Sequence, residues 1–206
     1  MFYLVKTPWW LKKLYPECVW EMPATGKTLY LSFDDGPHQE ATPFVLEELR
    51  KYNAKATFFC IGKNVKEHQS LYQRILDEGH KTGNHTFDHL NGWKTGDQKY
   101  FENVAEAGKF IDSDLFRPPY GRITKFQLKY LRASLGMNTI MWTCLSADFD
   151  AKISPQDCLQ NVLLTASEGS IIVFHDSGKA WERLRYALPI VLEHFSELGY
   201  KFARIG

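Results

Sequence analysis

Short apolar runs rich in β-branched and aromatic residues alternate with helical patterns along almost the whole chain. The five clear runs cover residues 28–33, 56–61, 137–145, 170–175 and 200–205. Of two weaker runs, one precedes Asn84 and the other ends at Arg117. Such alternation predicts a parallel sheet with crossover helices. We therefore expect an α/β fold, a closed or nearly closed β/α barrel of about seven strands. An open doubly wound sheet is the alternative.

Helix signals lie between these runs. A helix beginning at Thr42-Pro43 has an apolar face that packs on the sheet. Residues 154–157 (Ser-Pro-Gln-Asp) resemble a capping box with proline at the first helical position. Three glycines are expected to end helices, at Gly79, Gly169 and Gly199.

The composition fits one domain of 206 residues, with residues 1–25 as an N-terminal arm. The net charge of +1 and the lack of a basic stripe argue against a nucleic-acid partner. Pro8 and nearby lysines break the first apolar run, so no signal peptide is predicted and a cytoplasmic location is expected. No stretch approaches the ~20 apolar residues of a membrane span. Residues 9–11 (Trp-Trp-Leu) could dock on a membrane, although a packed arm is favoured.

Two adjacent aspartates, Asp34 and Asp35, end the first clear run and are followed by Gly-Pro. Neighbouring side chains on an extended segment point in opposite directions, so the two carboxylates can serve different purposes. The alternative is a plain turn, because Asp, Gly and Pro all favour turns.

His85 and His89 are four residues apart, a spacing that can place both on one face and bind one cation. A structural metal takes four protein ligands, whereas two histidines, one carboxylate and an open position for water form the catalytic pattern. Asp34 and Asp35 offer that carboxylate. Coincidence is the alternative for the histidine pair taken alone.

Arg117 ends another predicted strand and is followed by two prolines, Tyr120 and Gly121. The prolines restrict the backbone, so the N–H of Tyr120 or Gly121 can be aimed at an oxyanion. Arg117 is a fixed positive charge that could orient an aspartate. A surface loop with an exposed arginine is the alternative.

His175 ends the buried run that begins at residue 170, which suits a general acid or base. Asp148 follows the run 137–145 and could hydrogen-bond that histidine. A histidine satisfied within the core is the alternative.

In this order the motifs resemble the polysaccharide deacetylase family, also called the NodB-homology domain or family 4 carbohydrate esterases. The resemblance covers about residues 26–206. The matching motifs are residues 32–37 (Ser-Phe-Asp-Asp-Gly-Pro), His85 with His89, residues 117–121 and residues 172–175 (Ile-Val-Phe-His). One motif departs from the family: where Asp-x-x-Asp-Trp is usual, residues 145–149 read Leu-Ser-Ala-Asp-Phe.

The resemblance implies a distorted β/α barrel with about seven strands and assigns a role to each motif residue. It implies a divalent metal, commonly Zn²⁺, with Co²⁺ or another divalent ion as alternatives. The implied roles are Asp34 as general base, Arg117 as its orienting partner, Asp35, His85 and His89 as metal ligands, the Tyr120 N–H at the oxyanion, His175 as general acid, and Asp148 as the partner of His175. Substrate contacts are expected at Pro119, Tyr120 and Phe149.

The activity that the resemblance implies is removal of acetyl groups from the N-acetylated sugars of a poly- or oligosaccharide, of the N-acetylglucosamine type. An O-acetyl esterase acting on xylan or another glycan would use the same machinery. A catalytically silent sugar-binding module is the alternative of another class, and the filled base, acid and ligand positions argue against it. Leu145 and Phe149 replace the usual residues of a substrate-contacting wall, so the sequence does not identify the glycan that binds there. It also does not specify the chain length of the substrate or the oligomeric state of the protein.

Overall fold

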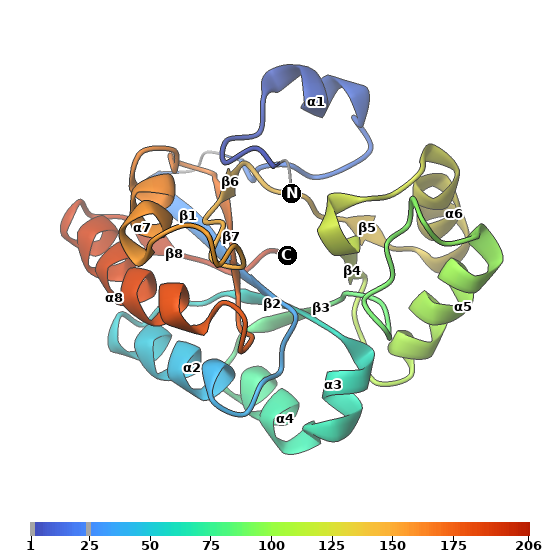
Figure 1. Ribbon diagram of the computed structural model, residues 1–206, viewed down its shortest axis with the longest axis horizontal. Coiled ribbons are helices and arrows are strands. Elements are labelled where there is room, and N and C mark those ends of the chain that lie inside the picture. Colours follow the sequence, from blue (N-terminus) through green and yellow to red (C-terminus); the bar gives the residue numbers. More distant parts are fainter. Residues whose placement is uncertain (1–2, 24–25) are drawn as a thin grey trace.

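The computed structural model describes residues 3–23 and 26–206. Its sheet follows the order β5-β4-β3-β2-β1-β7-β6, and β8 pairs with β1 beside this path. All of these strand pairs are parallel. The strands are β1 (Thr28–Asp34), β2 (Thr57–Cys60), β3 (Lys81–Asn84), β4 (Leu115–Phe116), β5 (Asn138–Thr139), β6 (Cys144–Leu145), β7 (Ile171–His175) and β8 (Lys201–Phe202). The predicted α/β fold with about seven parallel strands is confirmed, and Figure 1 shows the sheet curled into a distorted barrel.

The helices lie around this curled sheet, and all but the first cover its outside (Figure 1). They are α1 (Trp9–Leu14), α2 (Ala41–Lys51), α3 (Gly62–Glu67), α4 (Gln69–Asp77), α5 (Asp97–Gly108), α6 (Lys125–Leu135), α7 (Pro155–Leu163) and α8 (Trp181–Glu197), with a 3-10 turn, η1, at Pro119–Gly121. The capping box predicted for α7 is present: the Ser154 hydroxyl accepts from the Asp157 N–H, and the Asp157 carboxylate accepts from the Ser154 N–H. This helix ends at Leu163, however, six residues before the glycine at which we expected its end.

The two faces of the sheet are both buried, as is usual for parallel strands. Phe33 stacks between Phe58 and Phe174 on the face covered by helices such as α2 and α8. The opposite face contributes Phe59 and Ile171 to a second apolar cluster. Each strand therefore positions its last residues by packing on both sides, which fixes the groups that follow the strand ends.

The run 137–145, which we predicted to be one strand, is two short strands at opposite edges of the sheet. β5 pairs with β4, whereas β6 pairs with β7. Residues 140–143 cross between these edges. The N-terminal arm, whose described part is residues 3–23, pairs with the chain at both ends of this crossing: Val19 forms a bridge with Ile140, and Lys6 forms a bridge with Cys144.

No helix within residues 3–23 and 26–206 combines the length and the apolar character needed to cross a membrane.

Candidate metal and catalytic site

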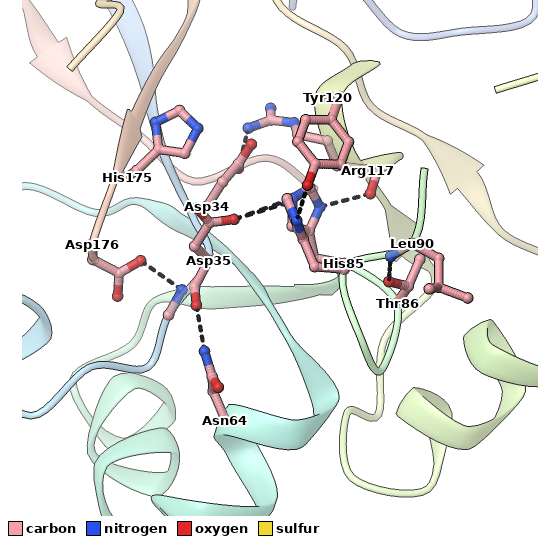
Figure 2. A network of polar contacts seen from close by, with 12 residues as sticks. Asp34, Asp35, Asn64, His85, Thr86, Leu90, Arg117, Tyr120, His175 and Asp176 are labelled. Carbon is pink, nitrogen blue, oxygen red and sulfur yellow. Dashed lines mark hydrogen bonds and ion pairs between the residues drawn. The ribbon is translucent and has the colours of Figure 1, made fainter. Parts of the chain in front are cut away.

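The residues predicted to carry chemistry follow four strands of the curled sheet. Asp34 and His175 are the last residues of β1 and β7 and lie opposite each other in the strand register. His85 and Arg117 directly follow β3 and β4. Because the carboxyl ends of parallel strands meet at one edge, these side chains converge there, as Figure 2 shows.

A cavity of about 650 Å³ opens at this edge. Its wall includes Asp34, Asp35 and His175, together with both histidines of the His-x-x-x-His motif. Tyr120 and Phe149, for which we predicted substrate contacts, also line it. Pro119, the third residue of that prediction, is buried and is not part of the lining in the described chain.

Asp34 and Arg117 form a buried ion pair. The Arg117 guanidinium is completely buried, and its NH1 group donates to Asp34 Oδ1 at 2.7 Å. Three further donors of Arg117 have acceptors, namely Ser32 Oγ and the carbonyls of Ile140 and Met141. Removing one partner of a buried pair leaves an uncompensated charge, which typically costs about 3–5 kcal/mol. Arg117 therefore holds one carboxylate oxygen of Asp34 in place, as we predicted for an orienting arginine.

Asp35 and the two histidines present three donor atoms to one point. These atoms all lie within 4.8 Å of one another. Asp35 Oδ1 lies 3.2 Å from His89 Nε2 and 3.7 Å from His85 Nε2. Ligands about 2.1 Å from a tetrahedral ion are about 3.4 Å apart, so both spacings suit one metal. Asp35 Oδ1 is also buried without a hydrogen-bond partner, as expected of an atom that a cation would satisfy.

The protonation states of these groups suit metal binding as well. His85 Nδ1 donates to the Arg117 carbonyl at 2.7 Å, so its Nε2 is left with a free lone pair toward Asp35. Burial lowers the pKa of His85 to about 4, which keeps the ring neutral at pH 7. Burial alone would raise the pKa of Asp35, but contact with His89 and the charge of His175 hold it below its ordinary value.

The His85–His89 segment is a loop and not a turn of helix. Thr86 and His89 both have positive φ angles, of 62° and 57°. Asn84 and Thr86 stabilise this loop, since the Asn84 side chain accepts from the Thr86 N–H and the Thr86 hydroxyl accepts from the Leu90 N–H. The four-residue spacing brings the rings together through these backbone conformations, for which the sequence offered no signal.

Asp176 is a functional candidate that we did not predict. Its carboxylate is completely buried and accepts from the Gly36 N–H and from the Thr42 hydroxyl. A side chain at Gly36 would overlap this carboxylate, so the turn after Asp35 requires a glycine. Figure 2 shows Asp35 between Asp176 on one side and the histidines on the other. The His-Asp pair at the end of β7 was the only local hint of this contact.

His175 is paired with Asp148, as predicted. The His175 ring Nδ1 lies 2.7 Å from Asp148 Oδ1, and the His175 backbone N–H donates to Asp148 Oδ2 at 2.7 Å. Asp148 is completely buried, whereas the His175 side chain is 14% exposed and reaches the cavity. Burial alone would lower the pKa of His175, but the Asp148 carboxylate and the charges of Asp35 and Asp34 raise it to about 9. His175 is therefore protonated at neutral pH.

This raised pKa gives a testable pH dependence. If protonated His175 is required, kcat/KM should fall as the pH rises through the folded-state pKa, well above the ordinary histidine value of about 6.5. Asp148→Asn removes the charge that contributes most to raising the pKa, so the alkaline limb should move to lower pH. A pH profile of both proteins measures this shift. An unchanged alkaline limb in Asp148→Asn would mean that another group causes it.

Tyr120 lies on the opposite side of the cavity from His175. Its φ of 61° turns the chain sharply within η1, and its hydroxyl lies 3.1 Å from His89 Nδ1. The side chain is 48% exposed, so it remains accessible to a ligand. The hydroxyl group contacts His89, a candidate metal ligand, and can orient its ring. This contact is separate from the role that we predicted for the Tyr120 backbone N–H.

Phe149 and Leu145 form the wall next to His175. The Phe149 ring packs edge-on against the His175 ring, with centroids 5.1 Å apart, and Tyr3 of the N-terminal arm packs on its other side. Leu145 is buried and also lines the cavity. The departure from the family motif therefore leaves this wall apolar and closed by the arm.

The chain is similar to several known proteins. A family model described as polysaccharide deacetylase matches residues 21–140. The chain is 34% identical over 193 residues to a peptidoglycan-N-acetylglucosamine deacetylase of Bacillus cereus, which covers 91% of this chain and 90% of that protein. It is 34% identical over 156 residues to a chitooligosaccharide deacetylase of Azorhizobium caulinodans, covering 72% and 73% of the two chains.

The crystal structure of the Bc1960 peptidoglycan N-acetylglucosamine deacetylase superposes with a TM-score of 0.87 at 29% identity. This superposition covers 97% of this chain and 95% of the other. The family model extends over more than half of the chain and includes β1, β3 and β4, from which most of the site residues project. The chain belongs to the polysaccharide deacetylase family, the family 4 carbohydrate esterases, whose enzymes are metal-dependent deacetylases of N-acetylated carbohydrates.

Proposed function

We propose that this protein removes the acetyl group from an N-acetylglucosamine-type sugar of an oligo- or polysaccharide, with one Zn²⁺ held by Asp35, His85 and His89. The observation that carries this proposal is the convergence of three donor atoms within 4.8 Å, with Asp35 Oδ1 buried and lacking a hydrogen-bond partner. Two histidines and one carboxylate leave a coordination position open for water or substrate. The wider proposal treats residues 1–206 as one catalytic domain with residues 1–25 as its arm.

A divalent cation in this position supplies a Lewis acid that polarises the acetyl carbonyl and makes water more acidic. Asp34 is proposed to accept the proton that the attacking water loses. Arg117 occupies Asp34 Oδ1 and anchors it, which leaves Oδ2 to act as the base. The two adjacent aspartates thus divide the work, one as base and the other as metal ligand.

His175 is proposed to donate a proton to the departing sugar nitrogen. An amine leaves poorly as an anion, so a positioned acid is needed when the C–N bond breaks. Asp148 holds His175 Nδ1 and keeps the ring protonated, so Nε2 is the nitrogen available as donor. The Tyr120 N–H is proposed to stabilise the negative charge that develops on the acetyl oxygen.

The test is metal removal followed by reloading, with acetate release measured on chitooligosaccharides, peptidoglycan fragments and acetylated xylan. Chelation should abolish acetate release, and one equivalent of Zn²⁺ or Co²⁺ should restore it, because no residue in the cavity can replace the Lewis acid. His89→Ala should lose the bound metal, whereas His194→Ala, at a histidine outside the cavity lining, should keep it. Full activity of the metal-free protein would refute the proposal, and acetate released from xylan alone would make it an O-acetyl esterase.

A further inference from the structure

The cavity extends beyond the metal site, beneath the N-terminal arm. Asp34, Asp35 and His175 lie in the same cavity as side chains from the first twenty residues. The arm contributes Trp10, Leu11, Leu14, Tyr15, Cys18 and Trp20 to the wall. All of these side chains are uncharged and apolar or aromatic, and Tyr15 adds a polar hydroxyl group.

The arm is anchored at both ends, which holds α1 across the cavity. On one side the Thr7 N–H donates to the Thr143 carbonyl at 3.0 Å, and on the other the Val19 N–H donates to the Thr139 carbonyl at 2.9 Å. α1 lies between these anchors and has no buried residue of its own. Figure 1 shows it standing apart from the other helices, on the side of the sheet between β5 and β6. Its inner side chains line the cavity, and Leu11 also packs against the buried cluster that includes Cys18 and Trp20.

The facing wall, from the barrel, is also apolar. It comprises Trp93, Ile123, Met141 and Trp142. The Trp93 indole N–H already donates to the Ile123 carbonyl, and the Arg122 guanidinium stacks over the Trp93 ring at 4.3 Å. This wall therefore offers a flat, mainly apolar surface, with the Arg122 guanidinium stacked on one of its rings.

Two polar side-chain groups on the arm side are occupied within the protein. The Thr7 hydroxyl donates to the Trp142 carbonyl, and the Trp20 indole N–H donates to the Tyr15 carbonyl. Among the described residues of the lining, Asp34 and Asp35 are the only carboxylates, and no Asn or Gln is present. Most of the side chains in this lining are apolar or aromatic, so a sugar ring placed here would leave several of its hydroxyl groups without partners, which is unfavourable. An apolar group has no hydrogen bonds to water to lose when it is buried here.

Resting on the proposed deacetylase function, we propose that the space between the arm and the barrel binds an apolar group attached to the acetylated sugar, of the alkyl or aryl glycoside class. The acetamido group would then lie at the metal site, and the apolar substituent would extend beneath α1. The arm would thus determine which acetylated sugars bind well, and Trp10 and Leu14 would be specificity-determining residues.

Methyl, butyl and octyl glycosides of N-acetylglucosamine test this in the zinc-loaded full chain, below the concentrations at which micelles form. Each methylene that becomes buried should lower KM by up to about fourfold. kcat should stay nearly constant, because contacts made equally in the ground state and the transition state do not accelerate the chemistry. A parallel titration of the metal-free chain, followed by tryptophan fluorescence, should show tighter binding of the longer glycosides.

Two adjacent tryptophans of α1 provide a matched pair of variants. Trp10 lines the cavity, whereas Trp9 does not and is 68% exposed. Trp10→Ser should raise the KM for the octyl glycoside several-fold more than the KM for the methyl glycoside. Trp9→Ser, on the same helix, should keep the wild-type dependence on chain length.

Equal KM values for the three glycosides, with acetate still released, would overturn this inference and leave the proposed function standing. A larger decrease in KM with a di- or tetrasaccharide of N-acetylglucosamine than with the octyl glycoside would also overturn it, because a further sugar would then occupy the space. If no acetate were released from any of them, the proposed function would fail. The fluorescence titration would then still decide whether the cavity binds apolar groups.

Discussion

Asp34→Asn should reduce acetate release by at least ~10²–10⁴-fold while leaving the metal bound. Asparagine cannot accept the proton from the attacking water, but its side chain is nearly the same size and can still accept from Arg117 NH1. Asp35→Asn should instead weaken metal affinity as well as turnover, because Asp35 Oδ1 faces both motif histidines. Metal content by mass spectrometry and kcat/KM for a chitooligosaccharide measure the two effects separately.

Asp88→Asn is the matched control for both substitutions. Asp88 lies between the two motif histidines in the chain, but its exposed carboxylate bonds to Asn103 and is not part of the cavity lining. This variant should keep both metal and turnover. Thermal unfolding must also be compared, because Asp34→Asn leaves the buried Arg117 without a counter-charge. If Asp34→Asn lost the metal and Asp35→Asn kept it, the roles of the two aspartates would be reversed.

His175→Ala should separate two kinds of substrate. On N-acetylated sugars it should lower kcat/KM by about 10²–10⁴-fold, because the amine then leaves without a positioned acid. On 4-nitrophenyl acetate much of the activity should remain, since the nitrophenolate leaves as a stable anion and needs no proton. The base and the metal ligands, which act on the acetyl carbonyl of either substrate, are unchanged in this variant.

Measurement of kcat/KM for both substrates in His175→Ala and Asp34→Asn, with metal content confirmed, decides this prediction. Asp34→Asn should damage both activities alike, because both reactions need the water to be deprotonated. An equal loss on both substrates in His175→Ala would show that His175 is more than a proton donor. It would then act as the base, bind the metal or maintain the shape of the cavity.

Local patterns in the sequence were sufficient for most strands and for the grouping of the site. β1 and β7 are continuous apolar runs, and such runs can be read without knowing their neighbours. Parallel strands present their carboxyl ends at one edge of the sheet. The polar residues that directly follow the predicted strands could therefore be placed together from the sequence. The α7 capping box was equally readable, since both partners lie within four residues.

Features that depend on distant partners could not be predicted. The run 137–145 is predominantly apolar and reads as one strand, yet it is divided because β5 and β6 pair with strands at opposite edges. Ser32 and Asp176 support the site through partners 85 and 140 residues away, so these contacts could not be derived from the local sequence.

The sequence by itself determined the strand–helix order, the candidate acidic, basic and metal-binding groups, and the edge of the sheet at which they meet. Only the tertiary structure decided how His85 and His89 turn toward Asp35, since their loop depends on positive φ angles held by surrounding contacts. It also decided that the N-terminal arm crosses the open side of the barrel and forms a wall of the cavity. The hydrophobic periodicity of a segment indicates which of its faces is buried, but which segment packs on that face depends on the packing of the whole chain.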